Sequence, residues 1–299
     1  MAEHHHHHGH RHEQLPADHA LSRAAVITVV FAVAEAVGGW WTGSLALLSD
    51  AGHMLTDAGA LLLGALAAWM ARRPPSQRHS YGLGRAEVVV ALVNATVMLA
   101  IVIALAYESF LRLQNPSPVN GAGAAAIAAV GLGVNLWVLR RLAPHRHDMN
   151  TRAARLHVLG DVLGSVAALA SGAIIAATGW TPIDALASLA IAVLITISAV
   201  RLMRESLHAL MEGVPQGLSV ETIGAELARV EGVLSVHDLH VWTLSGSRTA
   251  LSAHVVVRSL GEWDRMLSDL QVRLHAAFGI DHVTLQPESG VRPLRRIRG

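Results

Sequence analysis

The chain has 299 residues, of which 52% are hydrophobic and only 15% are charged, and its formal net charge at pH 7 is +1. A soluble domain typically carries about 25% charged residues, so this composition argues against an ordinary soluble protein, and the near-neutral charge gives no basis for binding nucleic acid. Cysteine is absent, which excludes disulfides and thiolate metal ligands and disfavours copper(I) as a bound ion.

The first 20 residues form a polar segment that contains the run EHHHHHGHRHE. This run is either native or an expression tag, and a tag would be excluded from reasoning about the fold. A native run would be a disordered cytoplasmic tract that holds metal loosely near the membrane. The segment is too polar to be a cleavable signal.

Six apolar runs follow, each long enough to cross a membrane, for which roughly 18 residues suffice. A soluble bundle of buried helices is the alternative, and six consecutive runs of this purity disfavour it. The predicted spans are residues 22–42, 45–71, 85–113, 120–142, 151–178 and 183–206.

Most arginines of the loops lie on one side of these spans, although Arg112 lies near the end of the third span. They lie in the second and fourth loops and after the sixth span, whereas the opposite loops, WWTGS, QNPSPVNGAG and TGWTPID, contain no basic residue. Positive residues favour the cytoplasmic side, so both termini are predicted to be cytoplasmic in a multi-pass protein of the inner or plasma membrane. The residues concerned are Arg72, Arg73, Arg78, Arg85, Arg140, Arg141, Arg146, Arg152, Arg155, Arg201 and Arg204.

After about residue 213 the composition becomes that of a soluble domain. SVETIGAELARVEG and SLGEWDRMLSDLQVRLHAAFG have helical spacing, and VLSVHDLHVWTL, TALSAHVVVR and DHVTLQPE alternate like strands. The order αββαβ predicts a small α+β domain, ferredoxin- or metallochaperone-like. We therefore expect a His-rich segment (1–20), a six-helix transmembrane domain (21–212), a cytoplasmic α+β domain (213–290) and a basic tail (291–299).

Two of the spans carry a histidine and an aspartate four residues apart: His53 with Asp57, and His157 with Asp161. Residues at i and i+4 share a helix face, so each span presents one imidazole and one carboxylate in the same direction. Both aspartates lie about 11 to 12 residues into their spans, near the bilayer middle. Two such helices could supply four ligands to an ion such as zinc. The alternative is a pair of internal hydrogen bonds, which the matched spacing and depth disfavour.

The stretches SLALLSDAGHMLTDAGALL, RHSYGLGRAEVVVALVNA, RAARLHVLGDVLGSVAAL and MEGVP together resemble the zinc-transporting branch of the cation diffusion facilitator family. VEGVLSVHDLHVWTLSGSRTALSAHVVV and DHVTLQPE extend the resemblance through the C-terminal domain. The resemblance implies a homodimeric exporter in which His53, Asp57, His157 and Asp161 bind the transported ion, with proton exchange and alternating access.

The sequence departs from that family in its second and fourth loops. Some members hold a second metal in the second loop, where this chain keeps His79 but has Leu83 and Ser76 at the other ligand positions. A lone histidine cannot close a metal site, so His79 is predicted to be an ordinary loop residue. The His-rich fourth loop of some members is reduced here to His145 and His147.

The C-terminal domain also contains candidate ligands for a structural zinc ion. His237 and His240 stand three apart on a predicted strand and are expected to face opposite sides of the sheet, so only one of them can join His254. The resemblance favours His240 with His254; Asp281 and His282 are the further candidates. Ordinary strand histidines are the alternative.

The ligand set predicts a secondary transporter that exports Zn²⁺ in exchange for protons, with no cofactor beyond the transported ion. Zinc needs neutral imidazole and ionised carboxylate, so metal and protons compete for the same groups. Cd²⁺, Co²⁺ and Ni²⁺ suit the same ligands. An intramembrane metalloenzyme and a metal-sensing receptor are the alternatives. Four ligands leave no open position for catalysis, which argues against an enzyme, and only a flux measurement separates a carrier from a receptor.

Overall fold

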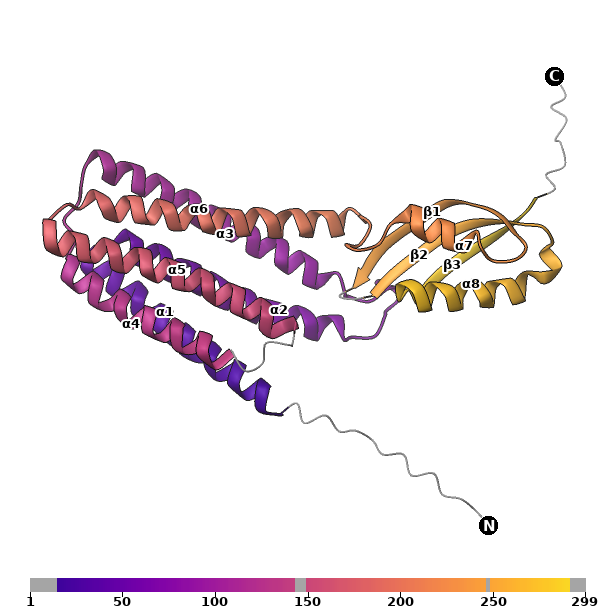
Figure 1. The fold of residues 1–299 in the computed structure, drawn as a ribbon, viewed down its shortest axis with the longest axis horizontal. Helices are drawn as coiled ribbons and strands as arrows, with labels where there is room; N and C mark the ends of the chain where they lie inside the picture. The colour runs from indigo at the N-terminus through magenta and orange to yellow at the C-terminus, as the bar shows by residue number, and fades with distance from the viewer. Residues whose placement is uncertain (1–14, 143–148, 246–247, 291–299) are drawn as a thin grey trace, which may run out of the picture. The chain divides into compact units, whose positions relative to one another are not determined.

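The structure is a computed structural model, and it describes residues 15–142, 149–245 and 248–290 (Figure 1). The His-rich run, the loop histidines His145 and His147, and the basic tail from residue 291 lie outside these residues. The interpretations given for them therefore stay predictions.

Six long helices occupy the first two thirds of the chain, as the apolar runs predict. Five of them are long and apolar enough to cross a membrane, and the described apolar part of the first, Val26–Thr42, is somewhat shorter. The prediction of six spans is confirmed, although the first helix begins seven residues earlier than expected. The helices are α1 (Leu15–Thr42), α2 (Leu45–Ala71), α3 (Ala86–Gln114), α4 (Gly121–Leu142), α5 (Met149–Thr178) and α6 (Pro182–Leu210).

By its packing, the chain divides into two compact units. The first comprises Met1–Gly59 with Val97–Ala199, and the second comprises Ala60–Thr96 with Val200–Gly299. Helices α2, α3 and α6 each pass from one unit into the other. This division differs from the transmembrane and cytoplasmic domains predicted from composition. Composition separates apolar from polar sequence and takes no account of which segments are in contact.

Small residues let the helices of the first unit approach one another closely. A Cβ atom on Gly172 of α5 would lie 2.5 Å from the backbone nitrogen of Ala125 on α4, and one on Gly121 would lie 2.5 Å from the backbone nitrogen of Ala176. Backbone contact of this kind is how membrane helices associate where no hydrophobic effect drives them together. The buried cluster beside these helices is correspondingly rich in alanine: Ala46, Ala124, Ala128, Ala168, Ala192 and Ala199.

A buried carboxylate joins the start of α6 to the start of α2. Asp184 accepts hydrogen bonds from the Ser44 hydroxyl at 2.6 Å and from the Leu45 backbone nitrogen at 2.5 Å. The first backbone N–H groups of a helix have no intrahelical acceptor, and a carboxylate there also complements the helix dipole. Asp184 therefore has a structural role that accounts for its burial.

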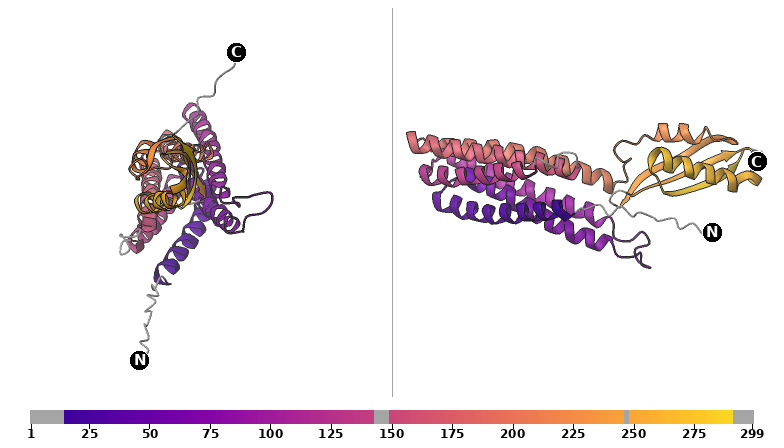
Figure 2. Two further views of the ribbon diagram at one scale, coloured as in Figure 1. Left: turned by 90° about the vertical axis from the view of Figure 1, so that its right-hand side faces the viewer. Right: turned by 60° about the horizontal axis from the view of Figure 1, so that its bottom comes forward.

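The second unit contains the C-terminal α+β domain, whose order αββαβ is confirmed. Strand β1 pairs antiparallel with β2, and β2 pairs parallel with β3. Helices α7 and α8 pack in one core with side chains of β2, including Leu251, Ala253 and Val255. Figure 2 shows both helices beside the sheet. The elements are α7 (Val220–Leu227), β1 (Val233–Ser245), β2 (Arg248–Val257), the short 3-10 helix η2 (Leu260–Glu262), α8 (Trp263–Phe278) and β3 (His282–Ser289).

Candidate metal centres

Helices α2 and α5 bring three of the four predicted intramembrane ligands together in the first unit. His53 Nδ1 lies 3.3 Å from Asp57 Oδ2 on the same helix, and His53 Nε2 lies 3.9 Å from Asp161 Oδ1 on α5. Asp161 is 2% exposed, and His53 and Asp57 are 14% and 17% exposed. The imidazole therefore lies between two largely buried carboxylates from different helices.

The fourth predicted ligand is His157. It belongs to α5, one turn before Asp161, but its side chain lies outside the described residues. Helical geometry places positions i and i+4 on the same face. Whether the ring points toward His53 stays a prediction.

The spacing of these groups suits a small dication with nitrogen and oxygen ligands. Zinc bonds of about 2.0–2.2 Å in a tetrahedron place neighbouring ligand atoms roughly 3.3 Å apart. The His53–Asp57 distance of 3.3 Å matches that value, whereas the His53–Asp161 distance of 3.9 Å exceeds it. They involve opposite nitrogens of the ring, so an ion held by one nitrogen requires a modest movement of the imidazole or of a carboxylate.

Two further acids lie inside the first unit, and neither belongs to the two histidine–aspartate pairs predicted from the sequence. Glu35 on α1 and Asp50 on α2 are both 0% exposed. Asp50 Oδ2 accepts a hydrogen bond from Ser165 Oγ at 3.0 Å, and Ser165 Oγ accepts one from Asn135 Nδ2 at 3.1 Å. Asp50 precedes His53 by three residues, so helical spacing applied to all acids of the span could have found it.

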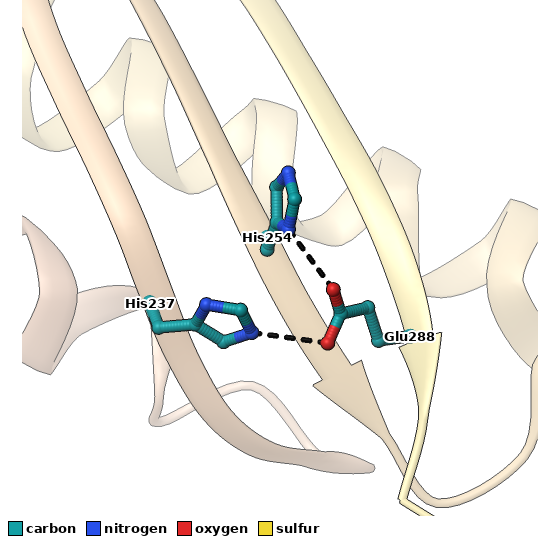
Figure 3. Close-up of side chains that lie close together, drawn as sticks. All are labelled: His237, His254 and Glu288. Carbon is teal, nitrogen blue, oxygen red and sulfur yellow. Dashed lines mark hydrogen bonds and ion pairs between the residues drawn. The ribbon is translucent and has the colours of Figure 1, made fainter. Parts of the chain in front are cut away.

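In the C-terminal domain, three side chains form a compact group of metal-ligating type: His237 on β1, His254 on β2 and Glu288 on β3 (Figure 3). Glu288 Oε2 lies 3.0 Å from His237 Nε2, and its Oε1 lies 2.9 Å from His254 Nδ1. The hydrogen bond to His237, followed by that to His254, holds the pKa of the Glu288 carboxyl below its usual range.

The expectation that His237 and His240 face opposite sides of the sheet is wrong. His237 pairs with His254 and His240 pairs with Ser252, so three steps along β1 correspond to two along β2. This β-bulge inserts one extra residue, and Asp238 within it has a φ of 51°. Both histidines consequently lie on the sheet face opposite the core, beside a strand whose alternate residues Ala253 and Val255 are buried.

The other residues predicted for this domain have different partners. His240 Nε2 lies 3.0 Å from Asp238 Oδ1, and Asp238 Oδ2 lies 3.8 Å from His254 Nε2. Asp281 lies 2.5 Å from His275 Nδ1, and the His282 ring stacks edge-on to Tyr81. Of the predicted set, the structure thus brings only His254 into the three-residue group and places His240 next to it.

His79 in the loop between α2 and α3 is exposed, and its backbone nitrogen donates to the Ser76 carbonyl at 3.1 Å. The same nitrogen lies 3.2 Å from the Ser76 hydroxyl. These are the contacts of a turn.

Comparison with known proteins agrees with this architecture. The model described as "Cation efflux transmembrane domain" matches residues 21–211, and the model described as "Cation efflux protein, cytoplasmic domain" matches residues 215–290. The chain belongs to the cation diffusion facilitator family. The resemblance in the sequence is thereby confirmed, and the protein is a multi-pass membrane protein of this family.

Named relatives match the chain over nearly its whole length. "Zinc transporter ZitB" of Escherichia coli is 40% identical over 93% of this chain and 91% of that protein. "Cadmium, cobalt and zinc/H(+)-K(+) antiporter" of Bacillus subtilis is 34% identical over 94% and 92%. "Metal cation efflux system protein CzcD" of Cupriavidus metallidurans is 35% identical over 94% and 90%. These members of the family are transporters of metal cations by name.

Proposed function

We propose that this protein is a secondary transporter that exports Zn²⁺ from the cytoplasm in exchange for protons. The observation that carries the proposal is the position of His53 between Asp57 of its own helix and Asp161 of α5 inside the helix bundle. Intramembrane ionisable residues are costly and mark ion pathways. The names of the three relatives, which specify zinc, metal cation efflux and antiport, support the same conclusion.

The proposed transport site consists of His53, Asp57, His157 and Asp161. Two carboxylates neutralise one dication, which lowers the cost of holding it in a region of low dielectric. Nitrogen and oxygen ligands also suit Cd²⁺, Co²⁺ and Ni²⁺, so these ions are proposed as secondary substrates. Four protein ligands close the coordination shell and leave no position for a catalytic water, and we accordingly propose a carrier and no enzyme activity.

Proton exchange follows from the chemistry of these ligands. When zinc departs, the ligand carboxylates and imidazoles regain the capacity to bind protons, and metal binding displaces those protons again. If the site opens alternately to each side of the membrane, zinc leaves outward and protons return inward. The proposed orientation places both termini in the cytoplasm of a cell whose inner or plasma membrane holds the protein.

For the C-terminal domain, proposed to begin at about residue 213, we propose metal binding that stabilises a homodimer. The ligands supported by the geometry are His237, His254 and Glu288, whose ligand atoms lie within 4.8 Å of one another. His240, from the sequence-derived set, is the neighbouring residue that could join them. The match to a cytoplasmic domain model named ZT_dimer supports the dimer.

The decisive experiment uses purified protein in proteoliposomes that contain a zinc dye and a pH dye. An imposed proton gradient should concentrate zinc in the compartment from which protons leave, and a zinc gradient should move protons the opposite way. Zinc movement without proton movement would identify a channel or uniporter. Zinc binding without flux would identify a receptor. Asp184→Asn is the matched control, because it alters a buried acid that holds helix ends together.

A further inference from the structure

Glu35, near the middle of the apolar part of α1 (Val26–Thr42), has no structural explanation among its contacts. Its side chain is 0% exposed, and neither carboxylate oxygen has a hydrogen-bond partner in the described part of the chain. One turn earlier on α1, Phe31 and Ala32 form an apolar cluster with Met54 of α2. A buried carboxylate without donors is expensive, whereas Asp184 shows how this fold satisfies an acid that serves only the structure.

Among the described residues, Asp50 on α2 and Asp161 on α5 act on Glu35 electrostatically, and both are acids. Like charges repel in a medium of low dielectric, so both oppose a negative charge at Glu35. Helix α4, which packs along α1, contributes the neutral Asn135, whose amide donates to Ser165. Ser165 in turn donates to Asp50, which favours a negative charge on Asp50 rather than on Glu35.

Buried acids that repel one another cannot all be ionised in a water-poor bundle unless a cation joins them. Glu35 has no donor among the described residues, whereas Asp50 accepts a hydrogen bond from Ser165, so Glu35 is the acid of these two that carries a proton when the neighbouring site is empty. A dication bound between Asp57 and Asp161 offsets their negative charges. The repulsion that favours the protonated form of Glu35 is then reduced, and the proton can be released.

We propose that Glu35 is a proton-carrying residue of the exchange, separate from the metal ligands. With the metal site empty, the Glu35 carboxyl holds a proton; when Zn²⁺ binds, the O–H bond breaks and the proton leaves to water on the cytoplasmic side. After zinc is released outward, the carboxylate takes up a proton from the outer medium. This inference rests on the proposed zinc/proton exchange and assigns one of its protons.

Counting protons tests the assignment directly. Purified full-length protein in weak buffer with a pH dye is titrated with Zn²⁺ alone. The number of protons released per bound zinc is then compared between the wild type and its variants. Glu35→Gln, which keeps the size and loses the titratable group, should still bind zinc but release about one proton fewer per site. Glu35→Asp should restore the number. Asp184→Asn should release the wild-type number.

The number of protons released tests both the assignment of Glu35 and the exchange itself. An unchanged proton number in Glu35→Gln, with zinc still bound, overturns the assignment while leaving the exchange intact. A wild-type protein that releases no protons overturns the exchange and the assignment together. If added K⁺ lowers the number of protons released per bound zinc, K⁺ occupies the site in place of a proton. That result overturns the proton assignment.

If Glu35→Gln does not fold, infrared difference spectra of wild type and Glu35→Asp replace it. Zinc should remove the band of a buried carboxylic acid, and Glu35→Asp should shift the frequency of that band. The absence of such a band from the wild-type spectrum overturns the proposal.

Discussion

His53 on α2 and Asp161 on α5 lie 3.9 Å apart, nitrogen to oxygen, although 107 residues separate them in the sequence. The two helices therefore bring their ionisable groups together, and neither helix alone offers more than a single imidazole. Their meeting inside the bundle is the basis for the first prediction.

Asp161→Ala should abolish zinc uptake, to less than about a tenth of the wild-type rate, because it removes a ligand and one of the two balancing charges. Uptake by everted vesicles, normalised to inserted protein, is the measurement. Thr56→Ala is the control, since the Thr56 hydroxyl donates to the Gly52 carbonyl of its own helix turn. Near-normal uptake by Asp161→Ala would refute the shared site.

The two candidate sets in the C-terminal domain can be separated by counting metal. His254→Ala should lower the zinc bound per protomer by about one ion and weaken dimerisation, because it removes a member of the three-residue group. Asp281→Ala should leave the metal number unchanged, since Asp281 pairs with His275. Zinc stoichiometry by elemental analysis, with dimer fraction by light scattering, provides both readouts. Metal loss in Asp281→Ala as well as in His254→Ala would favour the set predicted from sequence, because His254 belongs to both sets.

Glu288 should make the stability of the metal-free protein depend on pH. Its pKa is lower in the folded chain than in the unfolded one, because His237 and His254 hydrogen-bond its carboxylate. A lowered folded pKa gives stability that is present above the unfolded value of about 4.3 and is lost as pH falls through the folded value.

The corresponding measurement compares wild type with Glu288→Gln in the presence of a chelator. The difference between their unfolding temperatures should be largest near neutral pH and should vanish in strong acid. Hydrogen exchange of the β2 and β3 amides would locate the effect. A difference that grows in acid would contradict the assigned direction.

Gly172→Ala should destabilise the packing of α4 on α5. The added Cβ would lie 2.5 Å from the Ala125 backbone nitrogen, so the helices must separate, at a cost of about 1–3 kcal/mol. Gly133→Ala on α4 is the control, because nothing lies within 4 Å of its Cβ position. That change should be neutral or stabilising by up to about 1 kcal/mol, since alanine favours helix. Thermal unfolding in detergent would show the contrast.

Hydropathy and residue spacing were sufficient to predict the spans, the αββαβ order and the two histidine–aspartate pairs. These features depend on hydropathy and on spacing within a single helix or strand, and such local properties can be read from the residues. The sequence also allowed the family resemblance, which the comparisons confirm. The spacing of His53 and Asp57 predicted their common face because i and i+4 meet on any helix.

Which groups from different elements lie together depends on the packing of the folded chain, and local sequence patterns do not show it. No pattern marks the extra residue at Asp238, yet that bulge turns His237 and His240 to the same face and selects His237 as the partner of His254. The burial of Glu35 beside Asp50 likewise depends on how α1, α2 and α4 pack. An acid in an apolar run looks the same in sequence whether it is satisfied, like Asp184, or without a donor, like Glu35. The surroundings of a side chain come from residues far away in the chain, and packing alone brings those residues together.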